Sequence, residues 1–396
     1  MEICDVKQCT GCGVCASVCP FKCISMKENF EGFYYPEVDE SSCAKCGKCV
    51  RTCPNHCAMV RNAASFYMGW HKSIEVLRKS SSGGAFTALA EWIFGKGGVV
   101  FGAAFDHERR TIRHTEIQIK SDLDAIRLSK YYQGYVGQCY EQCKQALETG
   151  PVLFSGTACQ IAGLYAYLGR QYEQLYTVDV LCHGVASKKV VDAYIRSKEK
   201  RYRKKIVDYR FRVKPEDSDW FQGGGTRMRL DFADGTHVVE NKKYDTFFVG
   251  FNQYLFVRNS CYQCPYTGTN RVADFTLADY WGVPDSEIEE REKRYGVSLI
   301  LANSAKAKLV VEKLNETMEI RSIDPEKAIN GNQALRSPSS PNPYREDFFR
   351  RLSGYNYDRL IFRYYYPYFI KQRAVDGLKY FMGETGYQSI RKMLKG

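Results

Sequence analysis

The sequence has no long apolar run, no nucleotide-binding loop and no apolar leader. None of its apolar stretches approaches the roughly 18 residues that a membrane-spanning helix requires. The first residues, Met1 to Asp5, include acidic side chains and no apolar segment of the secretory type, so we expect a cytoplasmic protein. No Walker loop and no Gly-x-Gly-x-x-Gly motif follows a predicted strand, so the standard nucleotide-binding signatures are missing.

The composition is that of a soluble globular protein. The chain has 396 residues, of which 44% are hydrophobic and 26% charged, and these fractions exclude both wholesale disorder and a fibrous repeat. A chain of this length has material for two or three domains. Its 17 cysteines are the unusual feature, because in a reducing compartment thiols serve as metal ligands or catalysts rather than as structural disulfides.

Eight of the cysteines form two copies of one spacing, Cys-x2-Cys-x2-Cys-x3-Cys-Pro. Three thiolates at this spacing hold three corners of an iron-sulfur cube, and the fourth cysteine of each run reaches the other cube. The first run is Cys9, Cys12, Cys15 and Cys19, and the second is Cys43, Cys46, Cys49 and Cys53. We therefore predict one 4Fe-4S cluster on Cys9, Cys12, Cys15 and Cys53, and a second on Cys43, Cys46, Cys49 and Cys19.

Structural zinc is the alternative for these cysteines. Zinc sites usually take paired Cys-x2-Cys knuckles and four ligands, and eight thiolates at this spacing exceed what tetrahedral sites need. Cys23 and Cys57 also correspond between the two runs, and we expect them to be small buried residues beside the clusters. Residues 1–61 are thus predicted to be a dicluster ferredoxin domain of the bacterial type, which relays single electrons.

After residue 65 the sequence alternates between apolar, strand-like runs and helix-like stretches. The expected strands are 99–105, 152–154, 175–180, 206–213, 226–232, 275–278 and 298–301, and the expected helices are 85–95, 138–149, 157–168, 187–200 and 305–317. We predict an α+β (mixed α/β) body with a mixed sheet. Small-residue turns at 80–84 and 155–157 each precede a helix, where backbone N–H groups suit an anionic phosphate or simply cap the helix.

The remaining cysteines include a second candidate set. Cys261 and Cys264 form a Cys-x2-Cys-Pro pair, whereas Cys159 and Cys182 each follow a predicted strand. Parallel strands would bring the turns that follow them to one edge of the sheet, where four thiolates could converge. The alternative is a buried pair with two inert cysteines.

Several segments, read in order from about residue 65 to 340, resemble the coenzyme F-420 hydrogenase/dehydrogenase beta subunit family. They are Ser82-Gly83-Gly84, Leu128-Ser129-Lys130-Tyr131, Phe154 to Gln160, Asp179 to Val185, Cys261 to Cys264, and Asp274 to Gly282. This chain departs from the family pattern at three places. Ala158 and Ala186 stand where proline is usual, and Ala278 stands where glycine is common, which puts the close approach of a ligand near Asp279 in doubt.

The resemblance implies an iron-sulfur flavoprotein with a flavin-binding body. It implies a third 4Fe-4S cluster on Cys159, Cys182, Cys261 and Cys264, and contacts to FAD from Ser82, Gly83, Gly84, Thr87, Lys130, Tyr131 and Thr157. A cation such as Lys130 beside the flavin ring would stabilise its anionic reduced form, so Lys130 is our candidate catalytic residue. A solvated lysine is the alternative.

The chain carries a net charge of +12, and part of this charge lies in two segments. The basic run 198–205 either steers an acidic partner such as a ferredoxin or is a plain solvated helix face. Residues 355–396 hold eight tyrosines and eight Lys or Arg residues, a composition that fits a docking arm, a membrane-surface helix or, as the last choice, a nucleic-acid patch. We predict three domains: the ferredoxin domain 1–61, the FAD and 4Fe-4S domain 62–340, and a basic, aromatic helical extension 341–396.

The leading hypothesis is an oxidoreductase in which FAD exchanges a hydride with a small organic substrate, a deazaflavin coenzyme or another reducible compound. Three 4Fe-4S clusters would then pass single electrons to or from a carrier protein such as a ferredoxin. The alternative is a non-catalytic electron-transfer subunit bound to other oxidoreductase subunits, and a thiol redox protein that uses Cys139 and Cys143 is a weaker one. We expect neither nucleic acid nor a membrane as a partner.

Overall fold

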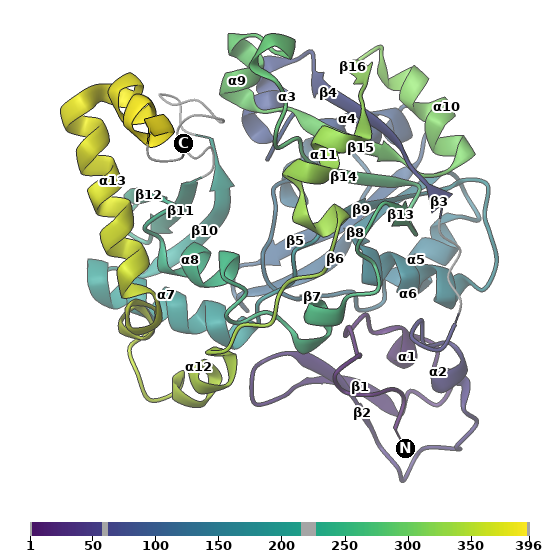
Figure 1. Ribbon diagram of the computed structural model, residues 1–396. Helices are drawn as coiled ribbons and strands as arrows, with labels where there is room; N and C mark the ends of the chain where they lie inside the picture. The colour runs from purple at the N-terminus through teal and green to yellow at the C-terminus, as the bar shows by residue number, and fades with distance from the viewer. Residues whose placement is uncertain (1, 58–61, 215–226, 394–396) are drawn as a thin grey trace.

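The computed structural model describes residues 2–57, 62–214 and 227–393 and has a mixed α/β architecture (Figure 1). A nine-stranded mixed sheet forms the centre, a small ferredoxin-like region lies below it in the figure, and a three-stranded sheet with long helices lies to one side. This arrangement confirms the predicted fold class. None of the helices in these ranges is both long and apolar enough to cross a membrane.

The secondary structure alternates along most of the chain. The α-helices are α1 Val14–Ser17, α2 Lys48–Arg51, α3 Ile74–Lys79, α4 Ala85–Phe94, α5 Cys139–Ala146, α6 Ala158–Leu168, α7 Lys188–Tyr202, α8 Thr246–Asn252, α9 Glu290–Tyr295, α10 Ala305–Leu314, α11 Pro325–Gly331, α12 Arg345–Arg351 and α13 Tyr357–Met393. The strands are β1 Ile24–Glu28, β2 Tyr34–Val38, β3 Asn62–Ala63, β4 Ser65–His71, β5 Val99–Asp106, β6 Thr111–Ile117, β7 Gly134–Tyr135, β8 Val152–Thr157, β9 Leu175–Val180, β10 Ile206–Val213, β11 Arg227–Phe232, β12 His237–Asn241, β13 Asn270–Arg271, β14 Phe275–Asp279, β15 Ser298–Ala302 and β16 Met318–Ser322. The short 3-10 helices are η1 Lys120–Ala125, η2 Asn259–Gln263, η3 Asp285–Glu287 and η4 Gln333–Leu335.

The central sheet has the strand order β16-β4-β15-β14-β9-β8-β5-β6-β7 and is covered on both faces. Successive side chains of a strand point to opposite faces. Leu153 accordingly packs in a core with helices α4 and α10, whereas Phe154 packs in a second core with α5 and α6. Strands β14, β9, β8 and β5 run parallel, so the segments that follow them leave from the same edge of the sheet.

The ferredoxin-like region packs against the body through its first helix. Gly13 and Gly47 precede α1 and α2 with φ of 81° and 70°, a left-handed conformation that glycine adopts at little cost. Helix α1 contributes Val14 and Val18 to the same core as α5 and α6. On the far side of the hairpin of β1 and β2, Arg345 makes a bidentate ion pair with the buried Glu31 at 2.7 and 2.6 Å.

A second lobe contains the three-stranded sheet β10-β11-β12 and helices α7, α8, α12 and α13. The first part of α13 belongs to its core through Leu360 and Ile361, while Tyr380 and Phe381 farther along are 86% and 85% exposed. The basic run 198–205 begins inside this lobe. Lys198 is fully buried and pairs with Glu240 at 2.5 Å and Asp245 at 3.4 Å, so it neither steers a partner nor lies on a solvated face.

The expected strands and helices of the body are confirmed within a few residues at each end, except that Thr226 lies outside the described residues, as does the expected domain boundary at residue 61. Strands β4, β6 and β16 were not predicted. Strand β4 lies second from one edge of the sheet, between β16 and β15, and its last four residues are all buried, so its sequence shows little alternation there. Cys139 and Cys143 lie one turn apart on α5 and are both buried, as expected.

The Arg345–Glu31 pair provides a test of how the ferredoxin-like region is docked. Replacing one member of a buried ion pair leaves the other charge uncompensated, so we expect Arg345→Ala to destabilise the chain by about 3 kcal/mol. Hydrogen exchange of the β1–β2 amides and urea unfolding would measure this. Lys27→Ala removes an exposed pair with Glu37, whose side chains are 59% and 60% exposed, and should cost less than about 1 kcal/mol. Equal effects of both changes would contradict this account of docking.

Candidate iron-sulfur and cofactor sites

The first predicted cysteine set comes together in the structure. Burial raises the pKa of Cys15, and the neighbouring Cys12 and Cys9 thiolates raise it further. Cys53 from the second run lies within electrostatic range of Cys12 and Cys15. Cys9, Cys12, Cys15 and Cys53 are therefore gathered at one end of the ferredoxin-like region, in the reciprocal arrangement that the repeated spacing predicts.

The second predicted set surrounds a small depression in the same region. Its walls include Cys19, Cys43, Cys46 and Cys49, together with Phe21 and Lys48. Cys23 is buried there with its Sγ 3.4 Å from that of Cys19, as expected of a small packing residue, whereas Cys57 is only half-buried and bonds to the carbonyl of Arg51. Among the described residues, no three His, Cys, Asp or Glu side chains are arranged to hold a single metal ion. Because Cys46 is exposed, the second set is close to solvent.

A cavity of about 650 Å³ opens at the edge of the central sheet where β8, β9 and β14 end. Cys159 from α6, Cys182 after β9, and Cys261 and Cys264 from η2 and its end all line it. Burial raises the pKa of Cys261 to about 12, with Cys264 and Cys159 adding to the rise. Burial likewise raises the pKa of Cys182, followed by the charges of Cys261, Cys159 and Cys264. The structure thus brings these four cysteines to one place.

Most of the residues expected at the flavin line the same cavity. They are Ser82, Gly84, Thr87, Lys130, Tyr131 and Thr157. Gly83 does not line it, because its backbone packs between β4 and β15: a Cβ there would lie 2.4 Å from the carbonyl oxygen of Gly69 and 2.7 Å from the amide of Ser298. Gly83 therefore permits close packing and lets the flanking residues face the cavity.

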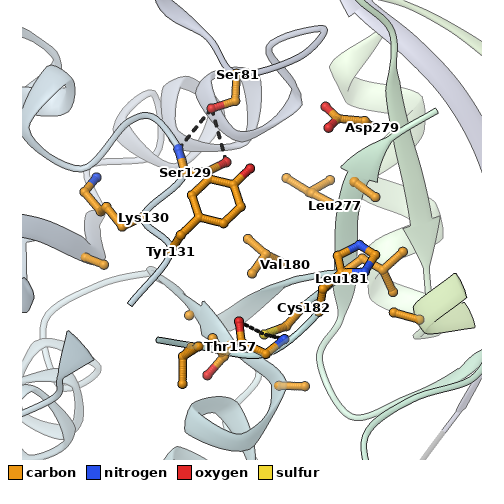
Figure 2. A pocket seen from close by; sticks show the side chains of 18 of the residues that line it. Ser81, Ser129, Lys130, Tyr131, Thr157, Val180, Leu181, Cys182, Leu277 and Asp279 are labelled. Carbon is orange, nitrogen blue, oxygen red and sulfur yellow. Dashed lines mark hydrogen bonds between the residues drawn. The ribbon is translucent and has the colours of Figure 1, made fainter. Parts of the chain in front are cut away.

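The Lys130 amine has no carboxylate partner among the described residues. It donates to the carbonyls of Arg127 and Leu128 at 2.6 and 3.2 Å and lies 5.4 Å from the centre of the Phe105 ring. Burial lowers its pKa to about 7. Figure 2 shows Lys130 and Tyr131 on opposite sides of one segment, with the Tyr131 ring directed toward the middle of the cavity.

Backbone pairing holds the Tyr131 segment in place. The amide of Ala186 donates to the carbonyl of Tyr131 at 3.0 Å, and the amide of Gln133 donates to the carbonyl of Ala186 at 2.9 Å. A proline at position 186 could not make the first of these bonds. Ala186 therefore ties the segment after β9 to the segment that carries Lys130 and Tyr131.

Several cavity residues were not singled out from the sequence. Arg212 from β10 pairs with Asp279 at the end of β14, at 2.8 Å, and also donates to the carbonyl of Ser81 at 3.0 Å. The Ser81 hydroxyl accepts from the amide of Ser129 at 3.0 Å (Figure 2). The carboxylate of Asp279 is thus held in an ion pair with Arg212. A ligand that approached Asp279, where Ala278 replaces the usual glycine, would therefore meet both side chains. Asp279 lies in a segment that resembles the family, so the sequence pointed to it. Arg212 lies in no such segment, and it reaches the cavity from a strand of the second lobe.

The charge around the cavity is mostly positive. Its lining contains six cations and, among the described residues, one carboxylate, Asp279. Arg212 pairs with Asp279, and Arg127 and Arg271 pair with Asp124 and Asp179 outside the lining. The excess positive charge therefore comes from Lys130, Lys242 and Arg258. Burial lowers the pKa of His114 to about 4, so this imidazole is neutral at pH 7. The buried atoms His114 Nδ1, Gln133 Nε2 and Arg258 Nη2 have no hydrogen-bond partner in the described chain. A cavity with excess cations and unused polar atoms fits an anionic, hydrogen-bonding cofactor.

Comparison with known protein families agrees with this arrangement. Residues 150–327 match the family model for the C terminus of the coenzyme F420 hydrogenase/dehydrogenase beta subunit, and residues 8–57 match the 4Fe-4S dicluster domain. The chain combines these two domains. Residues 150–327 are therefore similar to the C-terminal domain of that beta subunit, and residues 8–57 are similar to a domain that holds two 4Fe-4S clusters.

Several solved structures contain a similar chain, and no curated protein matches. One of these chains comes from the xenon-derivatised F420-reducing NiFe hydrogenase complex of Methanosarcina barkeri. It is 16% identical with a TM-score of 0.47, and the match covers 81% of this chain and 94% of that chain.

Lys130 provides a pH-dependent test of the cavity. Because its pKa is lowered to about 7, we expect its amine in the flavin-free chain to be acetylated readily above pH 7 and poorly below. Competitive acetylation followed by mass spectrometry would give the midpoint. Lys198 is the matched buried control. Burial lowers its pKa, but the charges of Asp245 and Glu240 outweigh this effect and raise the pKa above the usual lysine value, so Lys198 should stay unmodified up to pH 9. A Lys130 midpoint above pH 9 would contradict the assignment.

Proposed function

We propose that this chain is a FAD-dependent iron-sulfur oxidoreductase with three 4Fe-4S clusters, acting between an organic hydride donor or acceptor and a one-electron carrier protein. The observation that carries the proposal is one cavity with two kinds of lining. Four cysteines occupy one part of its wall, and the small-residue turn before α4 with Lys130 and Tyr131 occupies another. A flavin held there would exchange electron pairs with the substrate and single electrons with a cluster.

The proposed ligand sets follow the three groups of cysteines. Cys9, Cys12, Cys15 and Cys53 would hold the first cluster, Cys19, Cys43, Cys46 and Cys49 the second, and Cys159, Cys182, Cys261 and Cys264 the third. The grouping of thiols around each site supports this assignment. In this proposal residues 1–61 are the dicluster domain, 62–340 the FAD and 4Fe-4S domain, and 341–396 an extension of it.

The positions of the cysteine sets also suggest the order of transfer. Thr10 and Gly11, between the first ligands of the dicluster domain, line the cavity themselves. The Tyr140 hydroxyl lies 3.0 Å from the carbonyls of both Cys12 and Gln160, and α6 begins with the segment that carries Cys159. None of the cysteines of the second set lines the cavity, and its Cys46 is exposed. We infer that electrons pass between the cavity, the first set, the second set and an external carrier.

The cavity residues have distinct parts in holding the cofactor. The backbone amides of Gly84 and Ala85 open helix α4 and suit the pyrophosphate of FAD, with Ser82 and Thr87 alongside. Lys130 would stabilise negative charge on the reduced ring, and the Tyr131 ring offers an aromatic surface. Thr157 caps α6 through Gln160 and places its hydroxyl 3.1 Å from Cys159 Sγ. Thr157 is therefore positioned between the flavin side of the cavity and the cysteine side.

Iron and flavin contents test the proposal directly. We expect the anaerobically reconstituted chain to hold about 12 iron atoms and one FAD. Cys182→Ser/Cys261→Ser should lower the iron to about 8 and abolish electron transfer from reduced flavin to the dicluster domain. The matched control is Cys139→Ala/Cys143→Ala, which changes two buried cysteines outside the sets and should keep about 12 iron atoms. A wild-type chain with about 8 iron atoms and no flavin would contradict the proposal.

The flavin side has its own test in Lys130→Met. Loss of this cation should weaken FAD binding and lower the rate of flavin reduction by roughly tenfold or more, with all clusters retained, and absorbance titration with stopped-flow reduction would measure both. FAD should also suppress acetylation of Lys130 at pH 8. If neither a deazaflavin nor a sugar-linked substrate reduces the wild-type chain in the absence of other subunits, the chain is instead an electron-transfer subunit that depends on partners.

A further inference from the structure

Arg258 occupies the junction between the dicluster domain and the cavity. It is 1% exposed, and it immediately precedes η2, the segment that carries Cys261. The amide of Cys261 donates to the carbonyl of Arg258 at 2.9 Å. Its guanidinium reaches the other way: Nε donates to the carbonyl of Cys9 at 2.8 Å and Nη1 to that of Tyr34 at 3.0 Å. One residue thus contacts cysteines of both the cavity set and the first set.

The Arg258 charge is not neutralised by a neighbouring carboxylate. Within residues 2–57, 62–214 and 227–393, it forms no ion pair and lies instead 3.9 Å from the centre of the Tyr35 ring. Its Nη2 has no hydrogen-bond partner, although a buried donor without a partner costs about 1–3 kcal/mol. The charge lies between the loop that carries Cys9, whose carbonyl Arg258 binds, and the cavity that Cys159 and Cys261 line.

Gln133 adds a second unused donor at the same junction. Its Oε1 accepts from the amide of Tyr34 at 2.9 Å, while its Nε2 has no partner in the described chain. A Cβ on Gly11 would lie 2.3 Å from Gln133 Nε2 and 3.2 Å from Arg258 Cζ, so glycine is needed for the ferredoxin loop to approach both side chains. Both residues line the cavity as well.

We propose that Arg258, assisted by Gln133, is the redox-tuning bridge of the electron path: its unpaired charge and the two unused donors stabilise the reduced state of the clusters on either side of the junction. This inference rests on the proposed function. A cluster gains one negative charge when one electron enters it, so a nearby fixed cation raises its reduction potential. A shared cation would raise both potentials together and keep transfer between the two clusters nearly balanced.

The test is an EPR-monitored redox titration of the reconstituted full-length chain. In Arg258→Met, we expect the reduction equilibrium constants of the clusters on the first set and on the cavity set to fall by about tenfold, which is about 59 mV for one electron. The cluster on the second set should change by less than about threefold, because none of its four cysteines lines the cavity that Arg258 lines. Arg258→Lys, which keeps the charge, should recover most of the shift.

Two further variants separate tuning from packing. Gln133→Glu keeps the acceptor and the shape but replaces the unused donor with a negative charge, so it should lower the same two potentials even if Arg258→Met fails to fold. Glu31→Gln/Arg345→Met removes a docking contact without changing net charge and should leave all three potentials unchanged. Shifts in this control as large as in Arg258→Met would show that loosened docking, not charge, sets the potentials.

The outcomes distinguish the inference from the function on which it rests. A wild-type chain with about 8 iron atoms would overturn both the proposed function and the Arg258 bridge. In that case the iron content alone would show that the third cluster is absent. A chain with about 12 iron atoms, in which Gln133→Glu and every folded Arg258 variant leave the potentials within threefold of wild type, would overturn only the bridge. Equal shifts of all three clusters would also overturn it.

Discussion

The close packing of one short loop against the sheet body is the constraint on which the rest of the structure depends. Thr10 and Gly11, in the loop from Cys9 to Cys12, line the cavity. Because the rate of electron transfer falls steeply with distance, this contact decides whether electrons can pass between the dicluster domain and the sheet body. Small residues make the contact possible. On α6, a Cβ at Gly163 would lie 2.5 Å from the Tyr140 hydroxyl and 3.3 Å from Cys12 Cβ. Any larger side chain at Gly163 would therefore push the dicluster domain away from the helix that carries Cys159.

The cavity itself follows from the topology of the sheet. Parallel strands end at the same edge, so the turns after β8 and β9 meet there without any local signal between them. The second lobe closes this edge with Arg212, and η2 supplies the last two cysteines. Excess positive charge is concentrated at a site where cluster and flavin would bring negative charge. The basic overall composition is thus in part an interior property, as the buried Lys198 also illustrates.

The sequence was most informative where chemistry fixes spacing. The two cysteine runs and the alternation of body strands with helices were sufficient to predict the fold class, and the four later cysteines line one cavity, as the strand order led us to expect. Side-chain contacts between distant segments were not predictable. Arg258 and Gln133 lie 125 positions apart and meet the ferredoxin loop only in the folded chain. For Gly83 the family resemblance implies a contact with FAD, and the structure adds a packing reason for glycine there, since a Cβ would meet the backbone of β4 and of β15.

In the proposed function, one flavin and three clusters form a single connected electron path within this chain. The most direct measurement is an anaerobic reductive titration that counts electron equivalents while EPR records the clusters. The account predicts uptake of about five electrons per chain, two for the flavin and one for each cluster, with broadened signals from neighbouring reduced clusters. Uptake of about two electrons, confined to two clusters with no change in flavin absorbance, would contradict it.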